Sequence, residues 1–365
     1  MDRKKGTMDH TLLILVVILI VFGLTVLLST SAYNGQVKFS DPASYFKKQF
    51  FATILGVVAM YVVAEMDYHD LEKWAGAAYL LSLVLSTLVL FVGASINGSR
   101  RWLSLGPLSF QPSEFAKPAV ILFLARTISR REKKKKGMLE LFRTLVLILP
   151  IVGLVGTSNL STAVIILGIA VILVFVSSPF YLPFVGLFGA GAGFMGIFLG
   201  LESYRLERIA IWRDPESYEK GFQTIQGLYA IGSGGLFGTG LGGSIQKLGF
   251  VPEAQNDMIF SIICEELGLA GAVILLLLFF LLIWRFMVIA VHGEDLFGTL
   301  AAAGIMTHIA LQVILNVAVV TNTIPNTGIT LPFVSYGGTS VLFLLSEMGM
   351  AVSISTGHRL EHRRI

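Results

Sequence analysis

Charged residues are scarce in this chain: Asp, Glu, Lys and Arg make up 14% of 365 residues, while hydrophobic residues make up 55%. A soluble globular protein carries about 25% charged residues, which it needs to cover its surface. The scarcity therefore excludes a soluble domain of this size and indicates a polytopic membrane protein, as does the mean hydropathy of +0.78. Cys264 is the single cysteine, so an intrachain disulfide and paired-thiol chemistry are excluded.

Ten apolar stretches approach the roughly 20 residues that a helix needs to cross a bilayer. The first is longer than the roughly 7–15 apolar residues of a cleaved signal, so we expect it to remain as an anchor. The expected fold is an all-α polytopic membrane protein, with residues 1–365 forming a single transmembrane domain. We expect spans at residues 9–31, 50–66, 75–94, 113–130, 140–157, 161–178, 180–201, 258–284, 298–321 and 332–356.

Lys and Arg gather near both ends of the chain and within residues 126–143. Because positively charged segments stay inside, both termini are expected in the cytoplasm. Three longer or more polar segments then face outward: 95–112, 322–331 and the large loop 202–257 between the seventh and eighth spans. The chemistry is therefore expected on the extracytoplasmic face of the cytoplasmic membrane. The basic run 130–136 is interpreted as a topology or lipid signal rather than as a nucleic-acid site.

Asp257 is the most informative residue, because it ends a polar loop directly before the long apolar run from Met258 to Ile283. An acid at the mouth of a membrane helix is costly to place, so it is a functional-site candidate by default. The alternative is that Asp257 caps the helix, since Asp is favoured at helix N-termini. The two roles are compatible in one carboxylate.

A cluster of cationic and aromatic residues precedes the fourth span. Arg100 and Arg101 suit an anionic head group, and Trp102 suits the membrane interface, although an ordinary interfacial anchor would have the same composition. Directly afterwards, Glu114 and Lys117 lie at i and i+3 on one helix face. They are expected to form either a buried ion pair or part of a polar cavity that opens outward. Their position straight after the arginines favours the cavity.

Two further patterns have structural explanations. His308, Gln312 and Asn316 are spaced four apart in the ninth span, and interhelical hydrogen bonding accounts for such a stripe. No Cys or His cluster accompanies His308, so it is not interpreted as a metal ligand. The glycine-rich run 232–244 lacks the GK[ST] ending of a phosphate loop and is interpreted as a flexible or re-entrant substrate loop.

Several motifs give the chain a family resemblance over nearly its whole length. They are NGSRRWLSLGPLSFQPSEFAKP at 97–118, GFQTIQ from Gly221, GLGGSIQKLGFVPEAQNDM at 240–258, EELG at 265–268 and LPFVSYGGT at 331–339. With them the chain resembles the SEDS family (shape, elongation, division and sporulation), the RodA/FtsW/SpoVE-type membrane proteins of bacteria. The stretch 322–338 is more similar to the division and sporulation members than to the elongation members.

The resemblance implies a peptidoglycan glycosyltransferase that polymerises lipid II, the undecaprenyl-pyrophosphate-linked disaccharide-peptide, on the outer face of the membrane. The implied partners are a class B penicillin-binding protein, through its transmembrane helix and periplasmic-side domain, and other division or elongation proteins. Nucleic acid is not an expected partner. A divalent cation could share in stabilising the pyrophosphate, but the sequence shows no cation site, so the cofactor is unknown.

The family's essential carboxylate, in its PEA…D motif, falls on Asp257, which we expect to be the general base toward the acceptor hydroxyl. Arg101, Arg208 and Lys247 are expected to hold the donor pyrophosphate. The full set of expected substrate-binding residues is Arg100, Arg101, Trp102, Glu114, Lys117, Arg208, Gln226, Lys247, Glu253, Ser335 and Tyr336.

Asn159 marks a departure from the family pattern, which commonly has an acidic P-D-x-G-T turn at this place. Asparagine keeps the hydrogen-bonding capacity but loses the charge, so a role that needs a carboxylate here is in doubt. Two rival functions also stay open. One is a flippase that moves lipid-linked precursor through the same cavity, and the other is a non-catalytic scaffold for a penicillin-binding protein.

Overall fold

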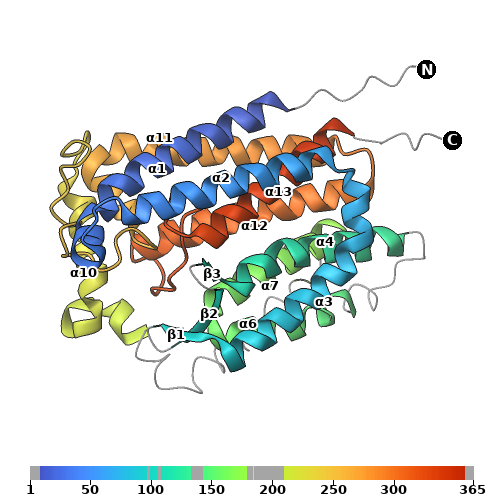
Figure 1. Cartoon of the computed structure of the whole chain (residues 1–365), viewed down its shortest axis with the longest axis horizontal. Helices are drawn as coiled ribbons and strands as arrows, with labels where there is room; N and C mark the ends of the chain where they lie inside the picture. The colour runs from blue at the N-terminus through green and yellow to red at the C-terminus, as the bar shows by residue number, and fades with distance from the viewer. Residues whose placement is uncertain are drawn as a thin grey trace.

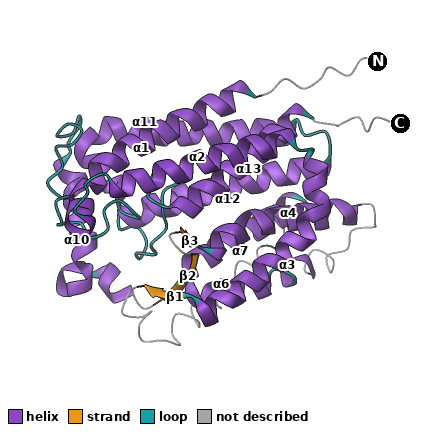
Figure 2. Ribbon diagram, in the orientation of Figure 1, coloured by secondary structure: helices purple, strands orange, loops and turns teal. Residues whose placement is uncertain are grey.

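The computed structural model describes residues 9–96, 99–105, 108–132, 143–178, 184 and 209–357. Long helices run side by side, with a small sheet and irregular loops gathered at one end (Figures 1 and 2). The helices are α1 His10–Phe39, α2 Ser44–Glu65, α3 Tyr68–Val92, α4 Pro112–Glu132, α6 Leu149–Ser158, α7 Leu160–Val176, α10 Phe222–Ser233, α11 Ile259–Val291, α12 Leu296–Val320 and α13 Gly338–Thr356. Two 3-10 turns, η1 Pro215–Ser217 and η2 Glu219–Gly221, precede α10.

Six helices are long and apolar enough to cross a membrane: α1, α2, α3, α11, α12 and α13. Two shorter apolar helices, Arg143–Ser158 and Leu160–Val176, accompany them. The prediction of a helical polytopic membrane protein is therefore confirmed, whereas the count of ten spans is not reached among the described residues. The expected span 180–201 lies outside those residues except for Phe184. Helix α4 occupies the expected fourth span but carries charges at both ends, so it is less apolar than the six.

Several helices begin at a residue whose side chain caps the first turn. Asp9, Asp67 and Asp295 cap α1, α3 and α12 by accepting a hydrogen bond from a backbone amide of the first turn. Helix α1 continues to Phe39, well beyond the expected end at residue 31, and α11 continues to Val291. Both helices therefore project beyond their apolar parts and carry polar residues to the loops.

The all-α prediction implied an irregular loop before α4, and this prediction was wrong. The loop forms a small antiparallel sheet of β1 Ala94–Ile96, β2 Ser99–Leu105 and β3 Leu108–Phe110, in that spatial order. The sheet lies at the end of the bundle that also carries α10 (Figure 2). Thr339, at the start of α13, donates a hydrogen bond to the carbonyl of Ser109 at 3.0 Å and so ties the sheet to the bundle.

Helix α12 carries a stripe of buried polar side chains, and each of them is bonded to another element. His308 Nδ1 lies 2.9 Å from Glu347 of α13, and Gln312 Nε2 donates to the Thr330 carbonyl at 3.0 Å. Asn316 Nδ2 donates to the backbone carbonyls of Asp257 and Ile329 at 2.8 and 2.7 Å. Interhelical hydrogen bonding is therefore confirmed for His308, whose partner lies on α13, and for Gln312, which also accepts from Lys117 of α4. Asn316 bonds loop carbonyls instead.

Glu114 and Lys117 form an ion pair inside the bundle. Lys117 Nζ lies 2.9 Å from Glu114 Oε2. Lys117 is 2% exposed and Glu114 is 7% exposed. Lys117 also donates to Gln312 Oε1 at 3.4 Å, and the Ser340 hydroxyl bonds the Glu114 carboxylate. Of the two arrangements that the sequence left open, the buried pair is the one formed.

We expect Lys117→Met to lower the free energy of unfolding by roughly 3–5 kcal/mol, because it leaves the Glu114 carboxylate buried without a counter-charge. The measurement is thermal or denaturant unfolding in a fixed detergent or nanodisc. The double variant Glu114→Gln/Lys117→Met should recover most of the loss.

Lys73→Met is the matched control, because Lys73 and Asp70 form an exposed pair with the same i, i+3 spacing. It should leave the melting temperature almost unchanged, since exposed pairs contribute little. A Lys117→Met variant with normal stability but lowered turnover would contradict the structural role and return the pair to the substrate site.

Candidate functional site

Asp257 lies between the loop that follows α10 and the start of α11. Its side chain is partly buried, and Gln223 Nε2 of α10 lies 3.5 Å from Oδ1. Helix α11 begins at Ile259, directly after its N-cap residue Met258. The backbone amides of Asp257 and Met258 bond the Asp257 carboxylate, so a role at the start of the helix and a catalytic role stay compatible.

The environment of Asp257 raises the pKa of its carboxyl group to about 6. Burial is the largest cause, and the negative charge of Glu253 adds to it. The side chain of Gln223 and the backbone amides of Asp257 and Met258 act in the opposite direction. Such a group is mostly ionised at neutral pH yet basic enough to accept a proton, which is the range suited to a general base.

The backbone that carries Asp257 is fixed by three consecutive hydrogen bonds. The carbonyls of residues 255–257 accept, in order, from the Tyr336 amide at 2.9 Å, the Ser335 hydroxyl at 2.6 Å and the Asn316 side chain at 2.8 Å. Ser335 also accepts a hydrogen bond from the Leu331 amide at 2.8 Å. Ser335 and Tyr336, which the sequence placed in the site, are therefore brought to Asp257 as supports of its loop.

Glu253 has a similar supporting position. It adopts a left-handed φ of 50° and forms an ion pair with Lys38 at the end of α1, at 2.6 Å. Its second oxygen accepts from the side chains of Gln255 and Asn256. Asn34, one turn before Lys38, donates to the Gln255 side chain at 2.8 Å. The end of α1 thus holds the loop that leads to Asp257.

The turn between α6 and α7 is bonded to the small sheet. Arg101 Nε of β2 donates to the Ser158 carbonyl at 2.7 Å, and Asn159 Oδ1 caps α7 by accepting from the Thr162 amide at 3.2 Å. Asn159 therefore keeps hydrogen-bonding capacity without charge, and its partner is an amide in the first turn of α7 rather than a loop amide.

The segment 327–328 connects this turn with Asp257. The Ser161 hydroxyl donates to the Thr327 carbonyl, and a Cβ added to Gly328 would lie 3.8 Å from Asp257 Oδ2. A series of contacts thus runs from Arg101 through the Asn159 turn and residues 327–328 to Asp257.

Lys247 does not face this space. Its ammonium group is buried, 2.6 Å from Glu266 Oε1 and 2.8 Å from the Ser29 hydroxyl. The adjacent Glu265 accepts hydrogen bonds from the amides of Ile245 and Gln246 at 2.9 and 3.4 Å. In this arrangement Lys247 serves to hold the glycine-rich loop to α11, and its side chain is not presented to a pyrophosphate.

The remaining expected residues are only partly placed. Arg100 and Trp102 lie in β2 with Arg101, and Arg208 lies outside the described residues. Gln226 is partly buried on α10, one turn after Gln223. Gln223 is the residue of the GFQTIQ motif that reaches Asp257, whereas the sequence pointed to Gln226. The two glutamines are spaced i, i+3 on α10, and this spacing marks both as candidates.

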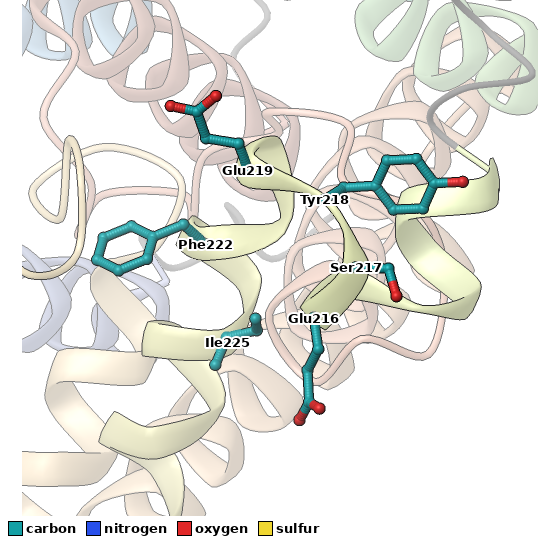
Figure 3. A pocket seen from close by; sticks show the side chains of 6 residues that line it. All are labelled: Glu216, Ser217, Tyr218, Glu219, Phe222 and Ile225. Carbon is teal, nitrogen blue, oxygen red and sulfur yellow. The ribbon is translucent and has the colours of Figure 1, made fainter.

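A cavity of about 540 Å³ lies beside the site, lined by Glu216, Ser217, Tyr218, Glu219, Phe222 and Ile225. Asp257 is not among its lining residues. The Glu216 and Glu219 carboxylates point away from each other (Figure 3). Within the described ranges, no group of three or more His, Cys, Asp or Glu residues is arranged to hold a metal ion.

Comparison with known proteins identifies the family. A family model described as cell cycle protein, FtsW/RodA/SpoVE, matches residues 9–360. The chain is 39% identical to stage V sporulation protein E of Bacillus subtilis, over 97% of this chain and 99% of the relative. It is 35% identical to the probable peptidoglycan glycosyltransferase FtsW of Geobacter sp., over 98% of this chain and 99% of the relative.

Solved structures agree with the sequence relatives. A chain from a structure described as a peptidoglycan synthase complex coordinating polymerization and crosslinking superposes with a TM-score of 0.80, at 30% identity over 96% of this chain and 98% of the other. The rod shape determining protein RodA of Thermus thermophilus gives a TM-score of 0.72, at 30% identity over 96% of this chain and 97% of the other. The chain therefore belongs to the FtsW/RodA/SpoVE family of cell cycle proteins.

Proposed function

We propose that this protein is a peptidoglycan glycosyltransferase that polymerises lipid II on the outer face of the bacterial cytoplasmic membrane. Membership of the family and the names of its FtsW relatives support glycosyl transfer. The structural observation that carries the proposal is Asp257, a carboxylate with a near-neutral pKa on a loop fixed by three backbone hydrogen bonds.

Asp257 is assigned the role of general base. It accepts the proton of the acceptor sugar's 4-hydroxyl as that oxygen attacks the anomeric carbon of the donor, and the bond from that carbon to the pyrophosphate breaks. Proton transfer of this kind contributes about 10²- to 10⁴-fold to a rate. Arg101 brings a permanent positive charge to the same end of the molecule, where it favours the departing pyrophosphate.

The placement of the chain ends supports the outward orientation. Helix α1 begins and α13 ends at the end of the bundle opposite to the sheet and α10 (Figure 1). With basic residues near both termini, the positive-inside rule assigns that end to the cytoplasm and Asp257 to the outer face. A ten-span topology, with the seventh span at residues 180–201, belongs to the same proposal.

A class B penicillin-binding protein is the proposed partner. The similarity to a chain of a peptidoglycan synthase complex supports it, because that complex coordinates polymerization with crosslinking.

The rival functions, a flippase and a non-catalytic scaffold, require different properties of the protein. A flippase needs a polar path to the inner face, and a scaffold needs no base. Incubating the purified protein with lipid II, with and without a partner, and looking for glycan polymer distinguishes catalysis from both.

We expect Asp257→Asn to lower the rate of lipid II polymerisation by about 10²- to 10⁴-fold while expression and membrane insertion stay normal. The change is nearly isosteric and removes only the capacity to accept the proton. Polymer length and rate are measured on gels at matched protein amounts. Asp214→Asn is the matched control, because Asp214 is an exposed acid of the same extracytoplasmic region and should behave like the native protein. Near-normal polymerisation by Asp257→Asn would rule out the general-base role.

The pKa of about 6 at Asp257 predicts a pH profile for polymerisation. Since a general base acts when ionised, the rate should be half-maximal near pH 6 and fall about tenfold per pH unit below it. The contribution of this group to folding stability changes with pH in the opposite direction to the rate. A carboxyl whose pKa is raised on folding binds more protons in the folded state, so between about pH 4 and 6 this group favours folding more as pH falls.

Loss of activity at low pH is therefore not expected to reflect unfolding caused by this group. Parallel melting curves check that the fold persists across the range. A rate that stays constant from pH 7 down to pH 5 would contradict the assignment.

Asn159 allows a test of whether a second carboxylate is required. The native chain should polymerise lipid II, and Asn159→Asp should change the rate only modestly, since either side chain caps α7. Asn159→Leu should lower stability by about 1–2 kcal/mol through loss of the cap. Polymerisation and melting temperature are compared at matched amounts. Activity confined to Asn159→Asp would indicate that the native chain is a scaffold.

A further inference from the structure

The glycine-rich loop, residues 234–250, has its apolar side chains turned outward. Six large ones are between 47% and 83% exposed: Leu236, Phe237, Leu241, Ile245, Leu248 and Phe250. A surface of this kind facing water is unfavourable, and contiguous apolar patches of this type mark contact with a membrane or another protein. The exposed apolar surface continues onto α11, where Leu269, Ile274 and Leu277 are between 54% and 59% exposed.

The one charged group of the same loop and two of its hydroxyls are bonded to α11. Lys247 is the one charged residue in 234–250, and it is buried against Glu266. The hydroxyls of Ser244 and Thr239 donate to the side chain and the carbonyl of Glu265, respectively. The loop therefore presents no charged side chain outward. This distribution, polar inside and apolar outside, suits a lipid environment and not an aqueous one.

Two contacts between α1 and α11 give the level of the loop relative to the membrane. Asp9 and Arg285 pair at 2.6 Å at one end, and the Ser29 hydroxyl donates to Glu266 at 2.8 Å at the other. The stretches between these contacts, 11–28 and 267–284, contain no charged residue. At 1.5 Å per residue each measures about 27 Å, close to the roughly 30 Å of a hydrocarbon core. The outer boundary of that core therefore lies near Glu266.

The loop reaches to this boundary and slightly below it. The amides of Leu269 and Ala270 donate to the carbonyls of Gly235 and Leu236 at 2.9 and 3.0 Å, so Leu236 lies beside α11 a few residues inside the uncharged stretch. Gly268 adopts a φ of 66°, and a Cβ there would lie 2.4 Å from the Gly238 amide nitrogen. The kink at this glycine gives the loop room to approach α11.

The backbone of the loop also suits a shallow position in lipid. The carbonyls of Gly235 and Leu236 accept from amides of α11. In addition, the amides of Thr239 and Gly240 donate to the carbonyls of Glu265 and Glu266, both at 2.9 Å. Unsatisfied backbone groups are costly in hydrocarbon, so a loop that enters it needs such bonds. These bonds place part of the loop backbone at low cost near the boundary of the hydrocarbon core.

We propose that the glycine-rich loop inserts its apolar tip, Leu236, Phe237 and Leu241, into the outer leaflet of the phospholipid bilayer. The contact is with acyl chains just below the head groups, a depth typical of interfacial segments. If the proposed function holds, the insertion keeps the Asp257 loop at head-group level. A lipid-linked sugar then reaches the carboxylate without leaving the membrane.

Site-directed spin labelling tests the insertion directly. Cys264 is buried and is the single cysteine, so a Cys264→Ala background accepts one label at a chosen position. The protein with Phe237→Cys is labelled in nanodiscs of phosphatidylcholine and phosphatidylglycerol, and its collision with oxygen and with the water-soluble nickel complex NiEDDA is measured. Leu277→Cys on the apolar face of α11 is the lipid reference, and Glu219→Cys in the outer turns is the water reference.

We expect the oxygen-to-NiEDDA collision ratio at residue 237 to shift away from that of residue 219 toward that of residue 277. A ratio equal to that of residue 219 would overturn the proposal, and so would low accessibility to both agents, which indicates burial beneath protein. If Phe237→Cys fails to fold, the same measurement on Leu241→Cys decides. Adding Asp257→Asn should leave the ratio unchanged, because insertion does not depend on turnover. Failure of the insertion and failure of the enzymatic role are thus distinguishable.

Discussion

A buried polar group inside a membrane bundle must find its partner within the protein, and helix α12 shows how far this one requirement organises the molecule. Its three polar side chains lie on one face and reach three different elements: Glu347 of α13, Lys117 of α4 and the backbone that carries Asp257. Unpaired, each would cost several kcal/mol in hydrocarbon. The stripe therefore sets how α4, α13 and the outer loop are placed around α12, and Asn316 extends that order to the candidate base.

The segment 329–337 transmits the same constraint to the outer surface. Its backbone and side chains are bonded to α12, to the carbonyls of residues 255 and 256, and to Gln49 of α2, which accepts from the Gly337 amide at 3.0 Å. These contacts come from helices far apart in the sequence. They fix the backbone of the loop that carries Asp257, so the position of its carboxylate is set mainly by that backbone.

Sequence reasoning was most successful where one physical quantity decides the outcome. Long uncharged runs make membrane helices, so α12 was predicted close to both of its observed limits, and α1 and α11 close to their first residues, although both continue beyond their expected ends. The sheet at 94–110 was missed because its strands are short and depend on pairing with each other rather than on a local preference. The sequence also could not predict the direction in which a loop side chain points. Lys247 has the composition of a phosphate ligand, and only the fold reveals that Glu266 already neutralises it.

The three acids around the start of α11 show why the type of residue does not reveal its role. Glu265 and Glu266 lie deeper and are surrounded by donors, namely backbone amides, two hydroxyls and one ammonium group. A carboxylate whose oxygens accept from so many donors is held in place and suits a structural role. Asp257 is partly buried, and its carboxylate is bonded by the amides of Asp257 and Met258 and lies 3.5 Å from Gln223 Nε2. Burial outweighs these donors and raises the pKa of Asp257, whereas Glu265 and Glu266 are held by amides, hydroxyls and an ammonium group. This difference in partners separates the candidate base from its two neighbours.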